Sequence, residues 1–279
     1  MKYRKLLEIS KKKLKENKID QNLSDILIND YLKITNIEKL NNIDINKKDI
    51  KKYNHALIKL IKNIPIQYII GNTNFYGYQF KVTKSTLIPR FETEELVEQT
   101  IKYIKRYFSY PIKILDIGAG SGNIGITLKK EIPDADVTLV DISKRALNVA
   151  LYNANQLKAK VKIKQSDIYS NLSKNNKFDI IISNPPYIKE QEEVAEVVLN
   201  NEPKRALYGG KDGLKYYKKI LRHAALFLKS RSMIALEIGE NQSQQILKIV
   251  KTNFNTFNYK IKKDLQGRER MLFIFFNIK

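Results

Sequence analysis

The chain has 279 residues, of which 43% are hydrophobic and 10% aromatic, enough apolar material to exclude wholesale disorder. This length suits one large α/β domain or a small domain plus a medium one. The sequence contains no cysteine and only two histidines, His55 and His223. A disulfide framework, a thiolate nucleophile and a multi-histidine metal site are therefore excluded.

The formal net charge is +22. Residues 1–90 hold 19 basic and 8 acidic side chains and the remainder holds 32 and 21, so the N-terminal third is the more basic per residue. Such a charge favours an anionic, RNA-rich setting such as the ribosome, or it reflects a biased composition with lysines on solvated faces. No apolar run has the length of a signal peptide or membrane span, so we expect a cytoplasmic protein without a membrane partner.

Residues 1–71 show helical periodicity and predict a small N-terminal bundle. Apolar residues recur at three- and four-residue steps, and a third helix is expected over Lys48 to Lys62. Aromatic and polar residues then alternate around Gly77 from Asn74 to Thr83, which predicts a β-hairpin within a linking segment, residues 72–88.

Residues 89–279 alternate strands with helices. Apolar strand segments are expected at 112–117, 135–140, 161–164, 178–182 and 233–238, and a terminal hairpin at 256–262 and 271–278. This pattern predicts an α/β fold with a doubly wound, mostly parallel, seven-stranded sheet.

A glycine-rich loop follows the first strand of this sheet, where ligands bind in open α/β folds. It reads Asp116-Ile117-Gly118-Ala119-Gly120-Ser121-Gly122, and its glycines let the backbone approach a ligand closely. The Lys-Ser/Thr pair of a Walker loop is missing, and Asn123 replaces the third glycine of a dinucleotide fingerprint. Phosphate binding is therefore disfavoured.

Two further aspartates follow the next two strands. Asp141 is placed to accept hydrogen bonds from both ribose hydroxyls, and Asp167 could accept from an adenine amino group. Together with Asp116 they suit a nucleoside without phosphate, such as S-adenosyl-L-methionine. The alternative is a tight strand–helix turn followed by helix-capping aspartates.

The segment Asn184-Pro185-Pro186-Tyr187 follows the fourth strand. The prolines fix the backbone and remove two donors, so the Asn184 side-chain oxygen and the Pro185 carbonyl could accept both hydrogens of a planar NH₂ group. Tyr187 could lie against the face of that group. The alternative is a generic Pro-Pro turn.

The same four residues resemble the motif of methyltransferases that act on adenine in nucleic acid or on the glutamine amide in protein. Further segments resemble the bacterial release factor glutamine methyltransferase family: Pro65 to Gly71, Leu87 to Arg90 with Glu92-Thr93-Glu94, Glu202-Pro203, Ala206-Leu207, Gly209 to Gly213, and Glu237-Ile238-Gly239 with Gln242. The likeness covers nearly the whole chain.

This resemblance implies a class I, Rossmann-like, S-adenosyl-L-methionine-dependent fold. It implies N5 methylation of the glutamine in the Gly-Gly-Gln loop of class I peptide chain release factors, which modulates translation termination. Residues 1–71 would be the release factor docking domain and 89–279 the catalytic domain. The expected cofactor-binding residues are Asp116, Gly118, Ala119, Gly120, Ser121, Gly122, Asp141, Asp167, Ile168 and Asn184. The expected glutamine-binding residues are Asn184, Pro185, Pro186 and Tyr187, with Asn184, Pro185 and Tyr187 catalytic.

Three positions depart from the family pattern: Phe91 stands in place of a proline, Asn201 in place of a tyrosine, and Ile168 where an aromatic residue is common. They concern substrate contacts and adenine packing rather than the transfer motif.

The competing functions are methylation of a ribosomal-protein glutamine, adenine-N6 methylation of DNA or RNA, and RNA binding without catalysis. The bundle leaves little room for a DNA target-recognition domain. The glutamates that follow Tyr187 predict an acidic rim unfavourable to nucleic acid.

Overall fold

The computed structural model describes residues 1–278, which separate into two compact units. One comprises Met1–Asn72 together with Ala195–Asn201, and the other comprises Thr73–Val194 with the described residues from Glu202 onward. The segment 195–201, which the sequence division placed with the sheet domain, thus belongs to the helical unit.

The first unit is helical. Its elements are α1 (Tyr3–Glu16), α2 (Asn22–Leu32), α3 (Asn36–Leu40), α4 (Lys47–Ile61), α5 (Ile66–Ile70) and α9 (Glu196–Asn201). The predicted third helix corresponds to α4, which begins where the Asn46 side chain accepts from the backbone N–H of Asp49 at 2.8 Å. The short α3 precedes it, with a capping box between Thr35 and Glu38. Leu14, Leu27, Ile28 and Tyr53 form the centre of this unit's own core.

The second unit begins with a two-stranded hairpin of β1 (Asn72–Phe75) and β2 (Tyr78–Lys81). The main sheet contains β3 (Lys113–Ile117), β4 (Asp136–Asp141), β5 (Lys162–Gln165), β6 (Phe178–Ser183), β7 (Leu228–Glu237), β8 (Asn258–Lys263) and β9 (Glu269–Phe276). The helical elements are α6 (Phe91–Tyr107), α7 (Asn123–Glu131), α8 (Lys144–Gln156), η1 (Lys204–Ala206), α10 (Lys215–Ala224) and α11 (Ser243–Asn253).

The strand order is β5-β4-β3-β6-β7-β9-β8. Neighbours from β5 to β7 pair in parallel, whereas β9 pairs antiparallel with both β7 and β8. The order reverses between β3 and β6, which creates the switch point where ligands bind. The predicted doubly wound, mostly parallel, seven-stranded sheet is confirmed.

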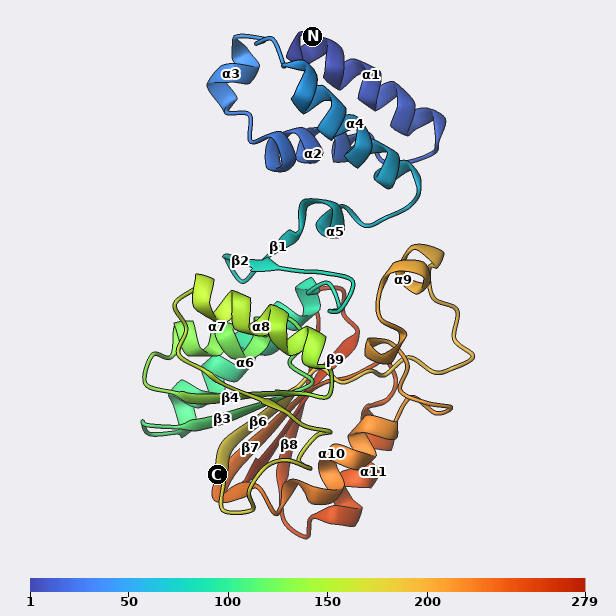
Figure 1. Ribbon diagram of the computed structural model, residues 1–279. Helices are drawn as coiled ribbons and strands as arrows, with labels where there is room; N and C mark the ends of the chain where they lie inside the picture. Colours follow the sequence, from blue (N-terminus) through green and yellow to red (C-terminus); the bar gives the residue numbers. More distant parts are fainter. Residues whose placement is uncertain (279) are drawn as a thin grey trace. The chain divides into compact units, whose positions relative to one another are not determined.

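Helices cover both faces of the sheet (Figure 1). Leu96 of α6, Ile126 of α7 and Ala150 of α8 share one buried cluster with the sheet, and helices α10 and α11 contribute to the other. Because both faces are covered, the central strands are largely apolar. Every residue of β6 is buried.

Strand β7 begins five residues earlier than the sequence indicated. Leu228 pairs with Phe178, a register irregularity follows, and regular pairing resumes at Met233. The intervening segment Lys229–Ser232 lacks an apolar run, so its periodicity gave no strand signal.

No helix within residues 1–278 is both long and apolar enough to cross a membrane.

Candidate active site

The glycine-rich loop turns directly from β3 into α7. The backbone N–H groups of Gly118 and Ala119 both donate to the carbonyl of Val140, at 2.9 and 3.0 Å. Gly118 and Gly120 have φ values of 72° and 55°, in the left-handed region that glycine adopts without a steric penalty. These bonds fix the loop to the end of the neighbouring strand.

Asp141 ends β4 and holds this loop in place. Its Oδ2 accepts from the backbone N–H of Gly120 at 2.9 Å and its Oδ1 from that of Ser143 at 2.7 Å. Burial raises the pKa of the Asp141 carboxyl, whereas these backbone hydrogen bonds oppose the shift. Each oxygen retains a lone pair that could accept a ligand hydroxyl.

Asp116 lies beneath the loop. It is fully buried, and its Oδ2 accepts from the backbone N–H of Gly125 at 2.9 Å. Its Oδ1 is buried without a hydrogen-bond partner, and burial raises the pKa of this carboxyl to about 7. The Asp116 carboxyl is therefore partly protonated near neutral pH.

Asp167 and Ile168 follow β5. Asp167 pairs through Oδ2 with the Lys219 ammonium at 3.1 Å and remains half-exposed. Ile168 has a φ of 56°, which is unfavourable for a β-branched side chain, and strain of this kind clusters at ligand sites.

The Asn184-to-Tyr187 segment leaves the end of β6. The Ser183 hydroxyl donates to the Ile117 carbonyl at 2.7 Å, which fixes β6 against β3 at the switch point. The Asn184 Nδ2 donates to Thr93 Oγ1 at 3.0 Å. Gln242 holds the far end of the segment, because its Nε2 donates to the Tyr187 carbonyl at 3.0 Å while its Oε1 accepts from the Gly239 N–H at 3.0 Å.

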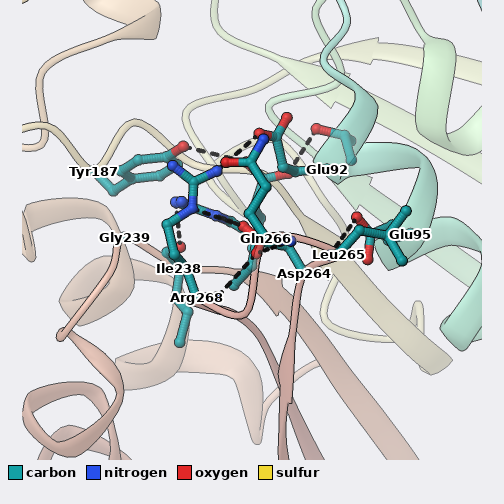
Figure 2. A network of polar contacts seen from close by, with 12 residues as sticks. Glu92, Glu95, Tyr187, Ile238, Gly239, Asp264, Leu265, Gln266 and Arg268 are labelled. Atoms are coloured by element: carbon teal, nitrogen blue, oxygen red, sulfur yellow. Dashed lines mark hydrogen bonds and ion pairs between the residues drawn. The ribbon is translucent and has the colours of Figure 1, made fainter.

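Tyr187 belongs to a buried polar network (Figure 2). Its hydroxyl donates to Glu237 Oε1 at 3.4 Å, and the Arg270 guanidinium lies 5.9 Å from its ring centroid. Burial raises the pKa of Glu237 to about 7, although a hydrogen bond from Thr93 and the charge of Arg270 oppose that shift. Burial and the Glu237 charge raise the pKa of the Tyr187 phenol well above its ordinary value, so this phenol stays protonated at neutral pH.

Glu202 ties the segment before α6 to the loop before η1. Its Oε2 accepts from the backbone N–H of Ile88 at 3.1 Å, and its Oε1 pairs with Arg90 Nη2 at 2.5 Å. The Glu202 carboxylate is buried, whereas Arg90 is half-buried.

These segments surround a cavity of about 360 Å³, within the size range of small-molecule sites. Of the predicted site residues, the cavity wall includes Gly118, Ala119, Gly120, Ser121, Asp141, Asp167, Ile168, Asn184, Pro185 and Pro186. Asp116, Gly122 and Tyr187 do not contribute to the wall, so in this structure they support it from behind. Side chains from three successive strand ends thus meet in one cavity.

None of the glutamates that follow Tyr187 lines the cavity, so the acidic rim around it stays a prediction. Its charged lining consists of Lys84, Arg90, Arg145, Arg205, Asp141 and Asp167. Before these glutamates, the Ile188 N–H donates to the Leu207 carbonyl at 3.1 Å. The charge of the cavity lining therefore does not separate a glutamine from an adenine substrate.

Of the three departures from the family pattern, Ile168 is part of this wall, whereas Phe91 and Asn201 are not. Phe91 is the first residue of α6 and is 59% exposed. Asn201 belongs to the helical unit, where its Nδ2 donates to the Asn63 carbonyl at 2.9 Å.

Three residues gain a role that the sequence did not indicate. Thr93 and Glu237 were noted only as parts of resembling segments, and their mutual contact spans 144 positions. Gly125 was not singled out, although a Cβ there would lie 2.1 Å from Leu139 Cδ2. A glycine in the first turn of a helix was the available signal.

Within residues 1–278, no group of three or more His, Cys, Asp or Glu side chains is arranged to hold a metal ion.

Comparison with known proteins gives close relatives over most of the chain. It is 36% identical over 266 residues to the release factor glutamine methyltransferase of Bacillus cereus, covering 93% of this chain and 94% of that one. It is 37% identical to the enzyme of the same name from Flavobacterium psychrophilum, covering 89% and 84%. The family model described as Methyltransferase small domain matches residues 102–210.

Solved structures share the fold at low sequence identity. A T. thermophilus 16S rRNA methyltransferase in complex with AdoMet and guanosine aligns with a TM-score of 0.54 at 17% identity, covering 74% of this chain and 50% of that one. A methyltransferase from Pyrococcus furiosus aligns with a TM-score of 0.52 at 18% identity, covering 80% and 98%. These likenesses concern the fold alone.

Proposed function

Because the chain belongs to the release factor glutamine methyltransferase family, we propose that it transfers a methyl group from S-adenosyl-L-methionine to a glutamine side-chain amide of class I peptide chain release factors. The target is the glutamine of their Gly-Gly-Gln loop. The observation that carries this proposal is the single cavity lined by the glycine-rich loop, Asp141 and Asn184-Pro185-Pro186.

The wall of this cavity fits the cofactor. Asp141 can accept from ribose hydroxyls, Asp167 from an amino group, and Ile142, Ile168 and Ala206 provide apolar surface for a base. When bound, S-adenosyl-L-methionine supplies an electrophilic methyl group on a sulfonium centre.

The Asn184 segment would hold the acceptor amide. A planar NH₂ group donates two hydrogen bonds. The Asn184 Oδ1 and the Pro185 carbonyl can accept them, because the two prolines have no backbone N–H that would occupy nearby acceptors. Holding the nitrogen in one orientation lowers the barrier to an in-line transfer. Tyr187, protonated and bonded to Glu237, would support this segment from behind.

The partner is a protein in this proposal, with no obligatory nucleic acid. The excess of basic residues in positions 1–90 would suit a ribosome-associated, cytoplasmic setting through long-range attraction to RNA.

The substrate class is tested by mass spectrometry of products. The protein is incubated with cofactor and separate pools of release factor, a Gly-Gly-Gln peptide, ribosomal protein, DNA and RNA. We expect one methyl group on the Gly-Gly-Gln glutamine, and Asn184→Ala should lower the rate about 100-fold or more. N6-methyladenine or a methylated ribosomal-protein glutamine, with unmodified release factor, would overturn the proposal.

A further inference from the structure

The hydroxyl of Thr93 lies between two side chains of the candidate site. Thr93 is in the first turn of α6 and is only 2% exposed. Its Oγ1 donates to Glu237 Oε2 at 2.6 Å and accepts from Asn184 Nδ2 at 3.0 Å. A chain of hydrogen bonds therefore runs from the end of β7 through α6 to the residue that follows β6.

The direction of these bonds follows from the donors available. A threonine hydroxyl has one proton, and Glu237 can only accept when it is ionised, which is its form above its pKa of about 7. The proton of Thr93 therefore goes to Glu237, and the remaining lone pairs of Thr93 Oγ1 face Asn184. Only the Nδ2 end of the Asn184 carboxamide can donate to them, so its other end must be the Oδ1 acceptor.

We infer that Thr93 and Glu237 are positioning residues for methyl transfer, which fix the Asn184 carboxamide so that Oδ1 is available to the acceptor NH₂ group. An Asn184 flipped by 180° would present its own NH₂ to the substrate, and two donors would face each other. The inference rests on the proposed function for its substrate and adds how the orientation of Asn184 is determined.

Thr93, the middle member of this chain of hydrogen bonds, is held by the contacts of α6. The start of α6 is held by the turn before β9, because Glu92 Oε1 pairs with Arg268 Nη2 and Glu95 Oε1 accepts from the Leu265 N–H, each at 3.3 Å (Figure 2). Arg268 is itself held by Asp264, at 3.1 Å. The first turn of α6 therefore offers Thr93 little freedom to move.

The surroundings of Glu237 are equally ordered. Its second oxygen accepts from the Tyr187 hydroxyl, and its backbone carbonyl accepts from the Tyr217 hydroxyl at 2.9 Å. The neighbouring Arg270 is 8% exposed and donates to the Ile238 carbonyl at 3.1 Å. A buried polar network with most of its members bonded is suited to holding one orientation.

The first test compares Thr93→Val with Thr93→Ser. Valine keeps the shape but removes the hydroxyl, whereas serine keeps the hydroxyl. We expect Thr93→Val to lower the single-turnover rate on a Gly-Gly-Gln peptide at saturating cofactor at least about tenfold. Thr93→Ser should stay within about threefold of the parent, and binding of S-adenosylhomocysteine, measured by calorimetry, should be unchanged in both.

Thr100→Val is the matched control. Thr100 is buried in the same helix, and its hydroxyl donates to the Leu96 carbonyl one turn earlier. The substitution removes a hydroxyl from α6 that does not contact Asn184, so the single-turnover rate should be unchanged. Equal losses in Thr93→Val and Thr93→Ser, or a normal rate in Thr93→Val, would overturn the inference.

The second test needs no substrate. Protein labelled with ¹⁵N-asparagine gives NMR signals from its side-chain amides. The signal of Asn184 is identified as the one that disappears in Asn184→Ala. We expect Thr93→Val to speed hydrogen exchange of this amide at least about tenfold by removing its acceptor, and Thr93→Ser to restore it. An unchanged Asn184 signal in Thr93→Val would refute the positioning role, even if the parent protein methylates no glutamine.

Discussion

Asp141 connects the cofactor loop to the cavity, since its carboxylate accepts from the Gly120 N–H and also lines the wall. We predict that Asp141→Ala weakens S-adenosyl-L-methionine binding tenfold or more, which corresponds to about 1.4 kcal/mol per decade. The physical reason is the loss of charge-assisted hydrogen bonds to ribose hydroxyls and of the bond that holds the loop. Calorimetry measures the dissociation constant.

Asp136→Ala is the control for that measurement. Asp136 begins the same strand, at the end opposite Asp141, and pairs at the surface with Lys162. Its removal should leave cofactor affinity unchanged, and equal losses in the two variants would remove Asp141 from the cofactor site.

Asp116 predicts a dependence of stability on pH. Its pKa is raised to about 7 in the fold from 3.8, so its protonated form is favoured by folding. The stability it contributes is complete below the unfolded pKa and is lost as pH rises through about 7. We therefore expect the free energy of unfolding of the parent to fall more between pH 5 and pH 8 than that of Asp116→Asn, by about 1 kcal/mol or more. Urea unfolding of the cofactor-free protein at both pH values measures this difference; parallel stabilities would contradict it.

At the scale of elements, the first turn of α7 packs unusually close to β4. A Cβ at Gly125 would lie 2.1 Å from Leu139 Cδ2 and 3.0 Å from Asp116 Oδ2, while the Gly125 N–H donates to that same carboxylate. The glycine lets α7 approach Leu139 of β4 and Asp116 of β3, whereas the sequence motif marked only the glycines of the preceding loop.

We predict that Gly125→Ala pushes α7 away from β4 and lowers stability by about 1–3 kcal/mol. Because the displaced helix begins at the loop, cofactor affinity should fall as well. Thermal unfolding and calorimetry together check this result. Normal stability and normal cofactor affinity in Gly125→Ala would contradict this prediction, because they would show that α7 can accept a Cβ at this position.

At the scale of the whole molecule, the helical unit and the sheet unit have separate hydrophobic cores. The buried cluster of the helices is confined to residues 3–69, and the clusters of the sheet unit begin at Phe75. The cavity wall is drawn entirely from the sheet unit. Chemistry therefore belongs to one unit, and docking of the release factor by the other remains a prediction.

We predict that removal of residues 1–71 spares cofactor binding but reduces methylation of intact release factor at least about tenfold more than methylation of a Gly-Gly-Gln peptide. The reason is that a basic helical unit outside the sheet can add contacts only to a large partner. The measurements are the methylation rates on the release factor and on the peptide, and the dissociation constant of the cofactor by calorimetry. Equal losses on both substrates would assign the helical unit a stabilising role only.

The sequence by itself determined the class of fold, because the buried strands are apolar runs and the glycine-rich turn stands at the end of the first one. It also located Asp141 and the Asn184 segment, since the ends of parallel strands meet at one edge of a sheet. These are local signals, readable within a few residues. They do not reach the start of β7, where the polar segment Lys229–Ser232 lies between the paired residues Leu228 and Met233 at a register irregularity.

Only the tertiary structure decided which of these residues line the cavity and which support it. Asp116 and Tyr187 stand in the same motifs as the residues of the wall, yet their side chains lie behind it. The contact of Thr93 with Glu237 joins positions 144 residues apart, and the orientation of Asn184 depends on it. Such contacts are created when α6 packs on the sheet next to β7, and no periodicity or spacing along the chain encodes the direction of a hydrogen bond.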